Sequence, residues 1–330
     1  MPALDGSILR AFLDAEGEAV SGDRLARELG VSRVAIWARL ARLRREGFRF
    51  AASPRKGYRL TATPGALHPA LIDAHLRRRR AHLPCTVLAE VDSTNSEAER
   101  RLAAGDEAPF AVLALRQTAG RGRLGRRWHS EQAGNLYLSI AFRPFIETAR
   151  LSPFTLWMGL ALCAHLEAAH GIRLGLKWPN DLLAADGRKV AGMLTEARVD
   201  ADRVRDLVFG LGLNIGSRPP ELRAIASSLR EAGGAPLDAN AAAAGVIAAL
   251  ESAWESFEDG TFRRQFQKLH ARHDCLAGRR VRVTLRGKPL AGVAEGIDDS
   301  GALLLRLAGG KRVSVASGEV TLREGRDAAA

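Results

Sequence analysis

Residues 117–128 read Gln-Thr-Ala-Gly-Arg-Gly-Arg-Leu-Gly-Arg-Arg-Trp, a segment that combines three glycines with four arginines and holds no acidic residue. It comes shortly after an apolar run that predicts a strand, Phe110–Leu115. Glycines let a backbone approach an anion closely and point N–H groups at it. Arginines add positive charge that binds a phosphate or a carboxylate. The segment predicts a pocket loop for an anionic ligand, although Gly/Arg stretches also occur in disordered RNA-binding regions.

The loop matches neither of two common nucleotide-binding patterns. The chain contains no GxxxxGK[ST] sequence, which excludes a P-loop. Neither a helix directly after the loop nor an acidic residue about 20 positions on is in place, which argues against a Rossmann fingerprint.

A second polar segment, residues 177–181, reads Lys-Trp-Pro-Asn-Asp and follows another predicted strand. Lys189 and Gly192 come next along the chain. Asn-Asp is a good turn pair, and a single lysine is usually solvated. Lys189, however, lies between short apolar strands, where a buried unpaired ammonium would be costly. It therefore needs an anionic partner, and a ligand is one option.

Strand-like and helical segments alternate around these motifs. The strands are expected at Thr86–Val91, Phe110–Leu115, Leu136–Phe142, Val190–Glu196 and Val204–Phe209, and the helices at Leu151–His170 and Ala239–Phe257. Because strands dominate the middle, the pattern predicts an α/β (α+β) unit with a mixed sheet. Five short β runs follow, which predict a small SH3-like barrel: Val281–Leu285, Ala291–Ile297, Ala302–Leu307, Lys311–Val315 and Glu319–Leu322.

The first 63 residues have the pattern of a winged helix-turn-helix. An apolar helix at Ser7–Leu13 precedes a second helix that stops at Gly30, and Ser32 can cap a third. An alternating hairpin, the wing, follows at residues 48–60. The residues expected to contact DNA lie on the exposed face of the third helix and at the tip of the wing: Ser32, Arg33, Trp37, Arg44, Arg55 and Lys56.

The charge distribution supports this interpretation. The chain of 330 residues has a formal net charge of +12, and residues 31–60 contribute nine basic side chains against one acidic, Glu46. Such a concentration is typical of a surface that contacts phosphates. Two alternatives stay open: a solvated basic face with Trp37 packed on a neighbouring domain, or a winged helix that serves as an interaction module. Tryptophan also makes no bidentate base contact.

Composition excludes several other classes. The three cysteines, Cys85, Cys163 and Cys275, are far apart and predict reduced thiols. The longest nearly apolar run, residues 154–164, is shorter than the roughly 20 residues that a membrane span needs. No secretory leader is evident at Met1, so we expect a cytoplasmic protein.

With these motifs in place, the whole chain resembles the bifunctional biotin–protein ligases and biotin operon repressors of the BirA type. The resemblance covers nearly all of residues 7–323. The matching landmarks occur in the family's order: Asp92-Ser93-Thr94-Asn95, Gln117 with residues 120–128, Asn135-Leu136-Tyr137, residues 177–181, Lys189, Gly192, residues 210–214 and residues 318–323.

The resemblance implies an ATP-dependent enzyme that forms biotinyl-5′-AMP and transfers biotin to a lysine of the biotin carboxyl carrier protein of acetyl-CoA carboxylase. It implies ATP and biotin as substrates, Mg²⁺ with the nucleotide, and no tightly bound metal. It also implies operator DNA as a partner, the adenylate as corepressor, a homodimer when the adenylate binds, and no membrane partner.

The family's functional residues carry over onto the matching positions. Lys189, Arg121 and Arg123 would be catalytic, and Asp181 is a guess for the magnesium neighbourhood. The residues that would bind biotin or the adenylate are Ser93, Thr94, Asn95, Gln117, Gly120, Arg121, Gly122, Arg123, Trp128, Lys189, Gly192, Asn214 and Arg323.

The resemblance also divides the chain. We expect a winged helix-turn-helix at 1–63, a linker at 64–84, the catalytic domain at 85–274 and the SH3-like barrel at 275–330. One departure is the segment Glu221–Leu229, which lacks the aromatic residue that the family's adenylate loop can carry. Three alternatives remain: a lipoate- or octanoate-type ligase, a regulator without catalysis, and a biotin ligase whose winged helix no longer represses.

Overall fold

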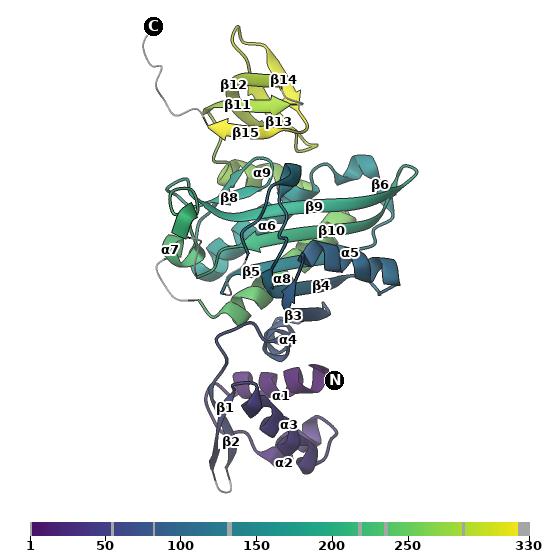
Figure 1. Cartoon of the computed structure of the whole chain (residues 1–330), viewed down its shortest axis with the longest axis vertical. Coiled ribbons are helices and arrows are strands. Elements are labelled where there is room, and N and C mark those ends of the chain that lie inside the picture. The colour runs from purple at the N-terminus through teal and green to yellow at the C-terminus, as the bar shows by residue number, and fades with distance from the viewer. Residues whose placement is uncertain are drawn as a thin grey trace.

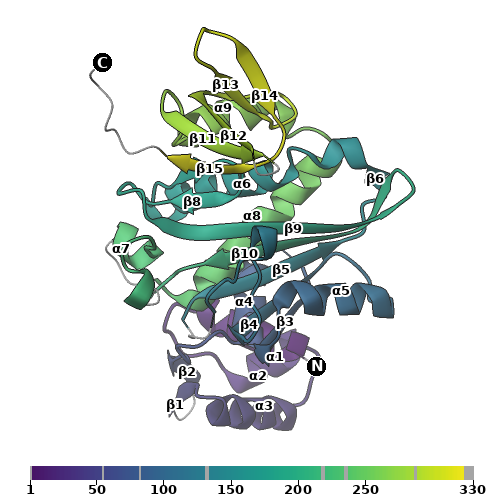
Figure 2. The same cartoon turned by 45° about the horizontal axis from the view of Figure 1, so that its top comes forward.

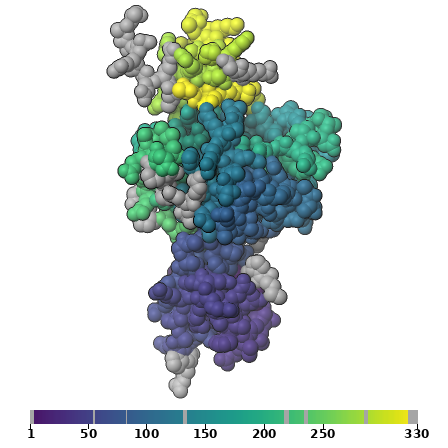
Figure 3. Space-filling model, in the orientation of Figure 1, coloured from purple at the N-terminus to yellow at the C-terminus, as the bar shows by residue number. Residues whose placement is uncertain are grey.

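The computed structural model describes residues 2–53, 56–81, 83–130, 134–216, 220–233, 237–285 and 288–322. They form three units in a row along the long axis of the molecule: a helical N-terminal lobe, a central sheet with helices, and a β barrel (Figure 1). The N-terminal lobe projects from the central body in the space-filling view (Figure 3).

The N-terminal lobe has the order of elements predicted for a winged helix-turn-helix. Its elements are α1 (Pro2–Asp14), α2 (Gly22–Glu28), α3 (Arg33–Arg45), β1 (Arg49–Ser53) and β2 (Gly57–Ala62). Ser32 caps α3 as expected, since its Oγ accepts the N–H of Ala35 at 3.1 Å. The wing closes at Gly57, whose φ of +101° and contact with the Val20 backbone exclude a side chain.

Residues 64–84, expected to be a linker, contain the helix α4 (Pro69–Arg78). Its Leu71 packs in the core of the N-terminal lobe, whereas Ile72 and Leu76 pack in the core of the central unit. Because the helix is apolar on two faces, it joins the two units as a shared packing element. Of its terminal arginines, Arg77 pairs with Asp73 at 2.8 Å.

The central sheet is mixed, as predicted. Its strand order is β3-β4-β5-β10-β9-β8-β7, with β6 paired to β10, and only β3 and β4 run parallel among the pairs described. The strands are β3 (Cys85–Val91), β4 (Phe110–Gln117), β5 (Leu136–Phe142), β6 (Ile146–Glu147), β7 (Gly175–Lys177), β8 (Asp181–Leu183), β9 (Lys189–Asp200) and β10 (Arg203–Leu213).

Alternation along the strands places helices on both faces of this sheet (Figure 2). In β4, Ala111 and Leu113 face the main core with α6 and α8, whereas Phe110 and Val112 face α5. The helices are α5 (Thr94–Ala104), α6 (Phe154–His170), α7 (Leu229–Gly233), α8 (Ala239–Glu258) and α9 (Arg263–His273).

The C-terminal unit contains the five predicted strands in one antiparallel sheet of order β14-β13-β12-β11-β15. They are β11 (Arg280–Leu285), β12 (Lys288–Ile297), β13 (Leu303–Arg306), β14 (Arg312–Val315) and β15 (Glu319–Leu322). In the described part of the chain, no helix has the length and hydropathy that a membrane crossing needs.

Candidate active site

A pocket opens between segments that are far apart in the sequence: the start of α5, the loop after β4, residues 177–181, the strands β9 and β10, and the first residues of β15. Its lining residues are Ser93, Thr94, Asn95, Gln117, Arg121, Gly122, Arg123, Leu124, Arg126, Arg127, Trp128, Lys177, Trp178, Pro179, Asn180, Asp181, Lys189, Gly192, Met193, Leu194, Gly210, Leu211, Gly212, Glu319 and Val320.

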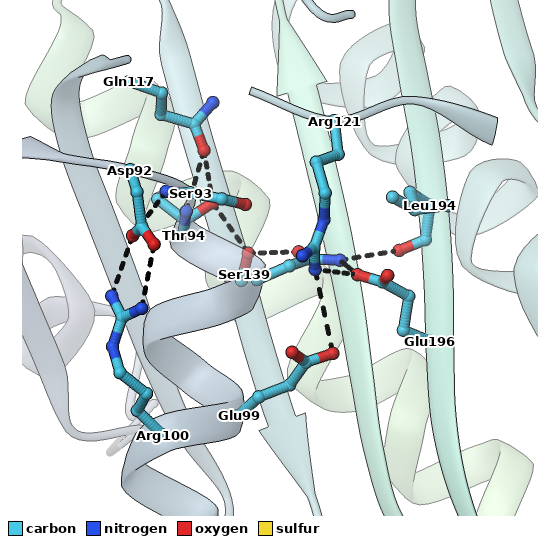
Figure 4. A network of polar contacts seen from close by, with 11 residues as sticks. Asp92, Ser93, Thr94, Glu99, Arg100, Gln117, Arg121, Ser139, Leu194 and Glu196 are labelled. Carbon is cyan, nitrogen blue, oxygen red and sulfur yellow. Dashed lines mark hydrogen bonds and ion pairs between the residues drawn. The ribbon is translucent and has the colours of Figure 1, made fainter. Parts of the chain in front are cut away.

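One end of the pocket is polar and built around the start of α5 (Figure 4). The Thr94 N–H donates to Gln117 Oε1 at 2.8 Å. Ser139 Oγ lies 2.8 Å from Thr94 Oγ1 and 2.5 Å from Asn95 Oδ1. A hydroxyl has one proton and an amide oxygen has none. The Thr94 hydroxyl directs its own proton at Gln117 Oε1, 3.1 Å away, so the Ser139 hydroxyl is the donor in both contacts, and Asn95 Oδ1 is the nearer acceptor.

The chain of hydrogen bonds continues to a carboxylate on β9. Asn95 Nδ2 donates to Glu196 Oε2 at 2.7 Å, and Arg121 Nη2 donates to the same oxygen at 2.7 Å (Figure 4). Arg121 also lies 3.7 Å from Glu99 Oε1. Burial, together with the nearby charge of Glu196, raises the pKa of Glu99. Arg121 thus joins its loop to both α5 and β9.

The turn that positions Thr94 is fixed by Asp92. Its carboxylate accepts the Ser93 N–H at 2.7 Å and two bonds from the Arg100 guanidinium at 2.8 and 2.9 Å (Figure 4). The hydrogen bonds from Arg100 hold the pKa of Asp92 at about 2. The pair ties the turn before α5 to the helix itself.

The middle of the pocket is a strip of glycines covered by Trp128. Gly212 and Gly192 are paired across β10 and β9. A Cβ at Gly212 would overlap the indole of Trp128, and a Cβ at Gly192 would lie 2.9 Å from Trp128 Cζ3. A Cβ at Gly210 would overlap the Asn95 amide. Because these glycines have no side chains, the Trp128 ring can pack directly against the sheet.

The other end of the pocket is cationic. Lys189 Nζ lies 2.6 Å from Asp181 Oδ1 and 5.2 Å from the centre of the Trp128 ring. Arg123 donates to Asn180 Oδ1 at 3.2 Å and to the Gly318 carbonyl at 3.4 Å. Burial lowers the pKa of the Arg123 guanidinium. This end collects positive charge where the Gly/Arg loop meets the barrel.

The barrel contributes directly to this end. Arg126 forms an ion pair with Glu319, the first residue of β15. The carbonyl of Gly318, the residue directly before Glu319, accepts a hydrogen bond from Arg123. The lining residues of the pocket therefore come from the central unit and from the barrel.

The structure gathers most of the predicted ligand-binding residues in this one pocket: Ser93, Thr94, Asn95, Gln117, Arg121, Gly122, Arg123, Trp128, Lys189 and Gly192, together with Asp181. Gly120 lies behind it, where a Cβ would meet Ser130 Oγ and the Trp128 carbonyl. Asn214 is buried outside the lining and donates to the Ser227 carbonyl at 2.9 Å. Arg323 lies outside the described residues.

The segment after β10 runs beside Lys189. The Lys189 N–H donates to the Ile225 carbonyl at 2.8 Å, and the Ser227 N–H donates to the Lys189 carbonyl at 2.8 Å. Ile225 itself is exposed. The segment 221–229, which holds no aromatic residue, therefore lies against the first residue of β9.

Several residues of this site had no ligand-binding role predicted from the sequence. Gly210 and Gly212 alternate along one strand, and this spacing is the signal that could have identified them. Glu319 carries no such signal, because only the docking of the barrel brings it to the loop. Ser139 gives none either, since every residue of β5 is buried.

The surface predicted to contact DNA is exposed along α3. Trp37 is exposed, so it does not pack on a neighbouring unit. Arg33 Nε lies 2.9 Å from Asp23, and the Arg44 guanidinium lies 5.7 Å from the Phe50 ring. Lys56 is exposed beside the wing tip, whereas Arg55 lies outside the described residues.

Comparison with known proteins identifies three matching family models. They are the biotin/lipoate A/B protein ligase family over residues 87–214, the biotin protein ligase C terminal domain over residues 277–323, and an HTH domain over residues 7–59.

Two relatives match over nearly the whole chain. Bifunctional ligase/repressor BirA of Bacillus spizizenii is 34% identical over 306 residues, which cover 90% of this chain and 92% of that protein. The Escherichia coli protein of the same name is 34% identical over 318 residues, 94% of each chain. A solved structure, biotin protein ligase from Aquifex aeolicus in complex with biotin and ATP, superimposes with a TM-score of 0.61 at 30% identity. It covers 73% of this chain and 99% of that one.

Proposed function

The chain belongs to the family of the bifunctional ligase/repressor BirA proteins, and we propose that it is an ATP-dependent biotin–protein ligase and a biotin operon repressor. The observation that carries the ligase activity is the order of groups along the pocket. A polar end, a glycine strip under Trp128 and a cationic end follow one another. Biotin has the same order: a ureido ring, an apolar thioether and chain, and a carboxylate.

The polar end suits a group that both donates and accepts hydrogen bonds. Thr94 Oγ1 accepts one hydrogen bond from Ser139, and its second lone pair can accept another from a ligand, while Gln117 offers an amide N–H₂. A ureido ring has two N–H donors and one carbonyl. Ser93, Thr94, Asn95 and Gln117 bind this ring, and Ser139 and Glu196 hold the orientation of Thr94 and Asn95.

The cationic end performs the first half-reaction. The biotin carboxylate attacks the α-phosphorus of ATP, a carboxyl–phosphate anhydride forms, and pyrophosphate leaves. The reaction brings two anions together, so the site must supply positive charge. Lys189 and Arg123 stabilise the charge that develops on the carboxyl and phosphoryl oxygens. Arg121 and Gly122 hold the loop over the reacting groups.

The second half-reaction needs no covalent enzyme intermediate. The mixed anhydride is the activated acyl donor, and the amine of a carrier lysine attacks its carbonyl carbon. An amide forms, AMP leaves, and the amine loses one proton. The carrier is the biotin carboxyl carrier protein of acetyl-CoA carboxylase, and the reaction takes place in the cytoplasm.

Magnesium fits this site as an ion carried by the nucleotide. Within the described ranges, no group of three or more His, Cys, Asp or Glu side chains could hold a metal. Asp181 and Glu319 are the carboxylates of the lining, and either can complete a shell made mostly of phosphate oxygens and water. Bound there, Mg²⁺ would neutralise charge on the departing pyrophosphate.

The repressor activity uses the winged helix-turn-helix, with the adenylate as corepressor. The protein binds operator DNA as a homodimer that forms with the adenylate, and the contacts come from Ser32, Arg33, Trp37, Arg44, Arg55 and Lys56. A gel shift with and without biotin and ATP tests this coupling. Operator affinity that does not respond to either substrate would contradict it.

Biotin-dependent exchange of labelled pyrophosphate into ATP tests the adenylation step without a carrier protein. We expect exchange with biotin and none with lipoate or octanoate. Exchange with lipoate in place of biotin would assign the pocket to another acid, and Lys189→Gln supplies the matched inactive variant.

A further inference from the structure

Two large apolar side chains lie exposed in the first half of α3, the second helix of the helix-turn-helix pair. Val34 is 75% exposed and Trp37 is 60% exposed. They are three residues apart, so they share one face of the helix. Figure 2 shows α3 along the outer end of the N-terminal lobe, away from the central unit. Their exposure is not explained by packing inside the chain.

The polar residues beside this pair already have local partners. Ser32 Oγ accepts the Ala35 N–H at 3.1 Å, and Arg33 Nε lies 2.9 Å from Asp23 Oδ1. The part of α3 that would enter a major groove therefore presents mainly apolar surface to the base edges. An apolar side chain distinguishes bases by one feature in that groove, the C5-methyl group of thymine.

The second half of the same helix is cationic. Arg44 and Arg45 are exposed, and the Arg44 guanidinium lies 5.7 and 6.0 Å from the rings of Phe50 and Tyr58 in the wing. The helix thus has an apolar half followed by a charged half. Phosphates complement the charged half, which makes DNA the occupant that the charge distribution favours over a protein partner.

We propose that Val34 and Trp37 recognise thymine methyl groups, so that the operator half-site has thymines at the positions facing the start of α3. The inference rests on the proposed DNA binding and names what that binding recognises. Arg44 and Arg45 position the helix through phosphates and carry no base preference.

The test begins with the full chain, biotin and ATP, and a library of randomised duplexes. The enriched duplex is then synthesised with deoxyuridine in place of each half-site thymine, which removes only the methyl group. Burying a methyl corresponds to about a fourfold change in affinity. We therefore expect about fourfold weaker binding for each contacted thymine, measured by fluorescence anisotropy.

Two variants separate base contact from phosphate contact. Trp37→Asn and Val34→Ala, both at exposed sites, should each lower the thymine-to-deoxyuridine affinity ratio, and the double variant should bring it close to 1. Arg45→Ala is the matched control. It should weaken binding to both duplexes equally and reduce the salt dependence of binding.

The outcomes distinguish the inference from the function on which it rests. An enriched sequence whose deoxyuridine form binds equally well would overturn thymine recognition and leave the repressor intact. A ratio that Trp37→Asn and Val34→Ala leave unchanged would assign the methyl contact to other residues. If no duplex is enriched with biotin and ATP present, DNA binding itself fails, and thymine recognition fails with it.

Discussion

Gly212→Ala tests the glycine strip that orders the pocket. The backbone at Gly212 is part of the extended strand β10 and accepts alanine without strain. The added Cβ would overlap the indole of Trp128. Because Gly212 is held in the sheet and Trp128 lies on the loop after β4, the indole is the group that moves.

Overpacking of this kind costs about 1–3 kcal/mol. If the displaced indole makes the free energy of biotin binding less favourable by that amount, biotin affinity falls roughly 5-fold to 140-fold. Isothermal titration of biotin into the variant measures the change directly. Gly216→Ala is the matched control, because a Cβ there meets nothing closer than the Gly134 carbonyl at 3.6 Å.

A double-mutant cycle shows whether the effect passes through the ring. Trp128→Ala removes the group that the new methyl displaces, so Gly212→Ala should then change biotin affinity little. An equal loss of affinity in the Trp128→Ala background would refute the reasoning. It would mean that the methyl blocks the ligand itself or distorts the sheet.

Three further predictions concern single groups. Ser139→Ala leaves the buried Asn95 Oδ1 without the proton it accepts, so the Kd for biotin should rise about tenfold; an unchanged Kd would remove Ser139 from the binding network. Lys189→Gln should slow adenylate formation about 10²- to 10³-fold in a single-turnover assay, and adenylation at the normal rate would exclude a role in the transition state. The Asp92 carboxyl, with its pKa lowered from 3.8 to about 2, stabilises the fold above pH 4 and loses that contribution as the pH falls toward 2. Asp92→Asn should therefore lower the Tm at pH 7 more than at pH 3, and an equal difference by calorimetry at both pH values would contradict this assignment.

Local chemistry made much of the fold predictable. Apolar alternation identified the central strands β3, β4 and β5, because each has side chains packed on one or both faces of the sheet. It underestimated β9, which extends to Asp200, because the outer end of this strand is exposed and no buried face marks it. It also ended β10 at Phe209, whereas the strand runs to Leu213.

Contacts between units were the part that sequence patterns missed. The sequence of the segment expected to be a linker gave no hint that its helix α4 belongs to two cores at once. Glu319 reaches Arg126 only because the barrel docks on the loop. A pairing across 193 residues has no local pattern, so it could be found only after the chain was folded.

Within the pocket, too, local chemistry identified some residues, and contacts made only in the folded chain identified others. Lys189 was identifiable because an ammonium among apolar strands needs an anionic partner, and the structure provides Asp181 at 2.6 Å. Glu196 was not, since an acidic residue near a strand end is usually solvated. Its importance depends on Asn95 and Arg121, which approach it from α5 and from the loop.

The mass of the carrier tests the proposed ligase activity most directly. The protein is incubated with biotin, ATP, Mg²⁺ and a biotin carboxyl carrier domain, and the carrier is weighed by mass spectrometry. A biotin–protein ligase adds the mass of one biotin to the carrier, and Lys189→Gln should lower the rate of this gain. A carrier that gains mass with lipoate or octanoate but not with biotin, or with none of these acids, would contradict the proposed activity.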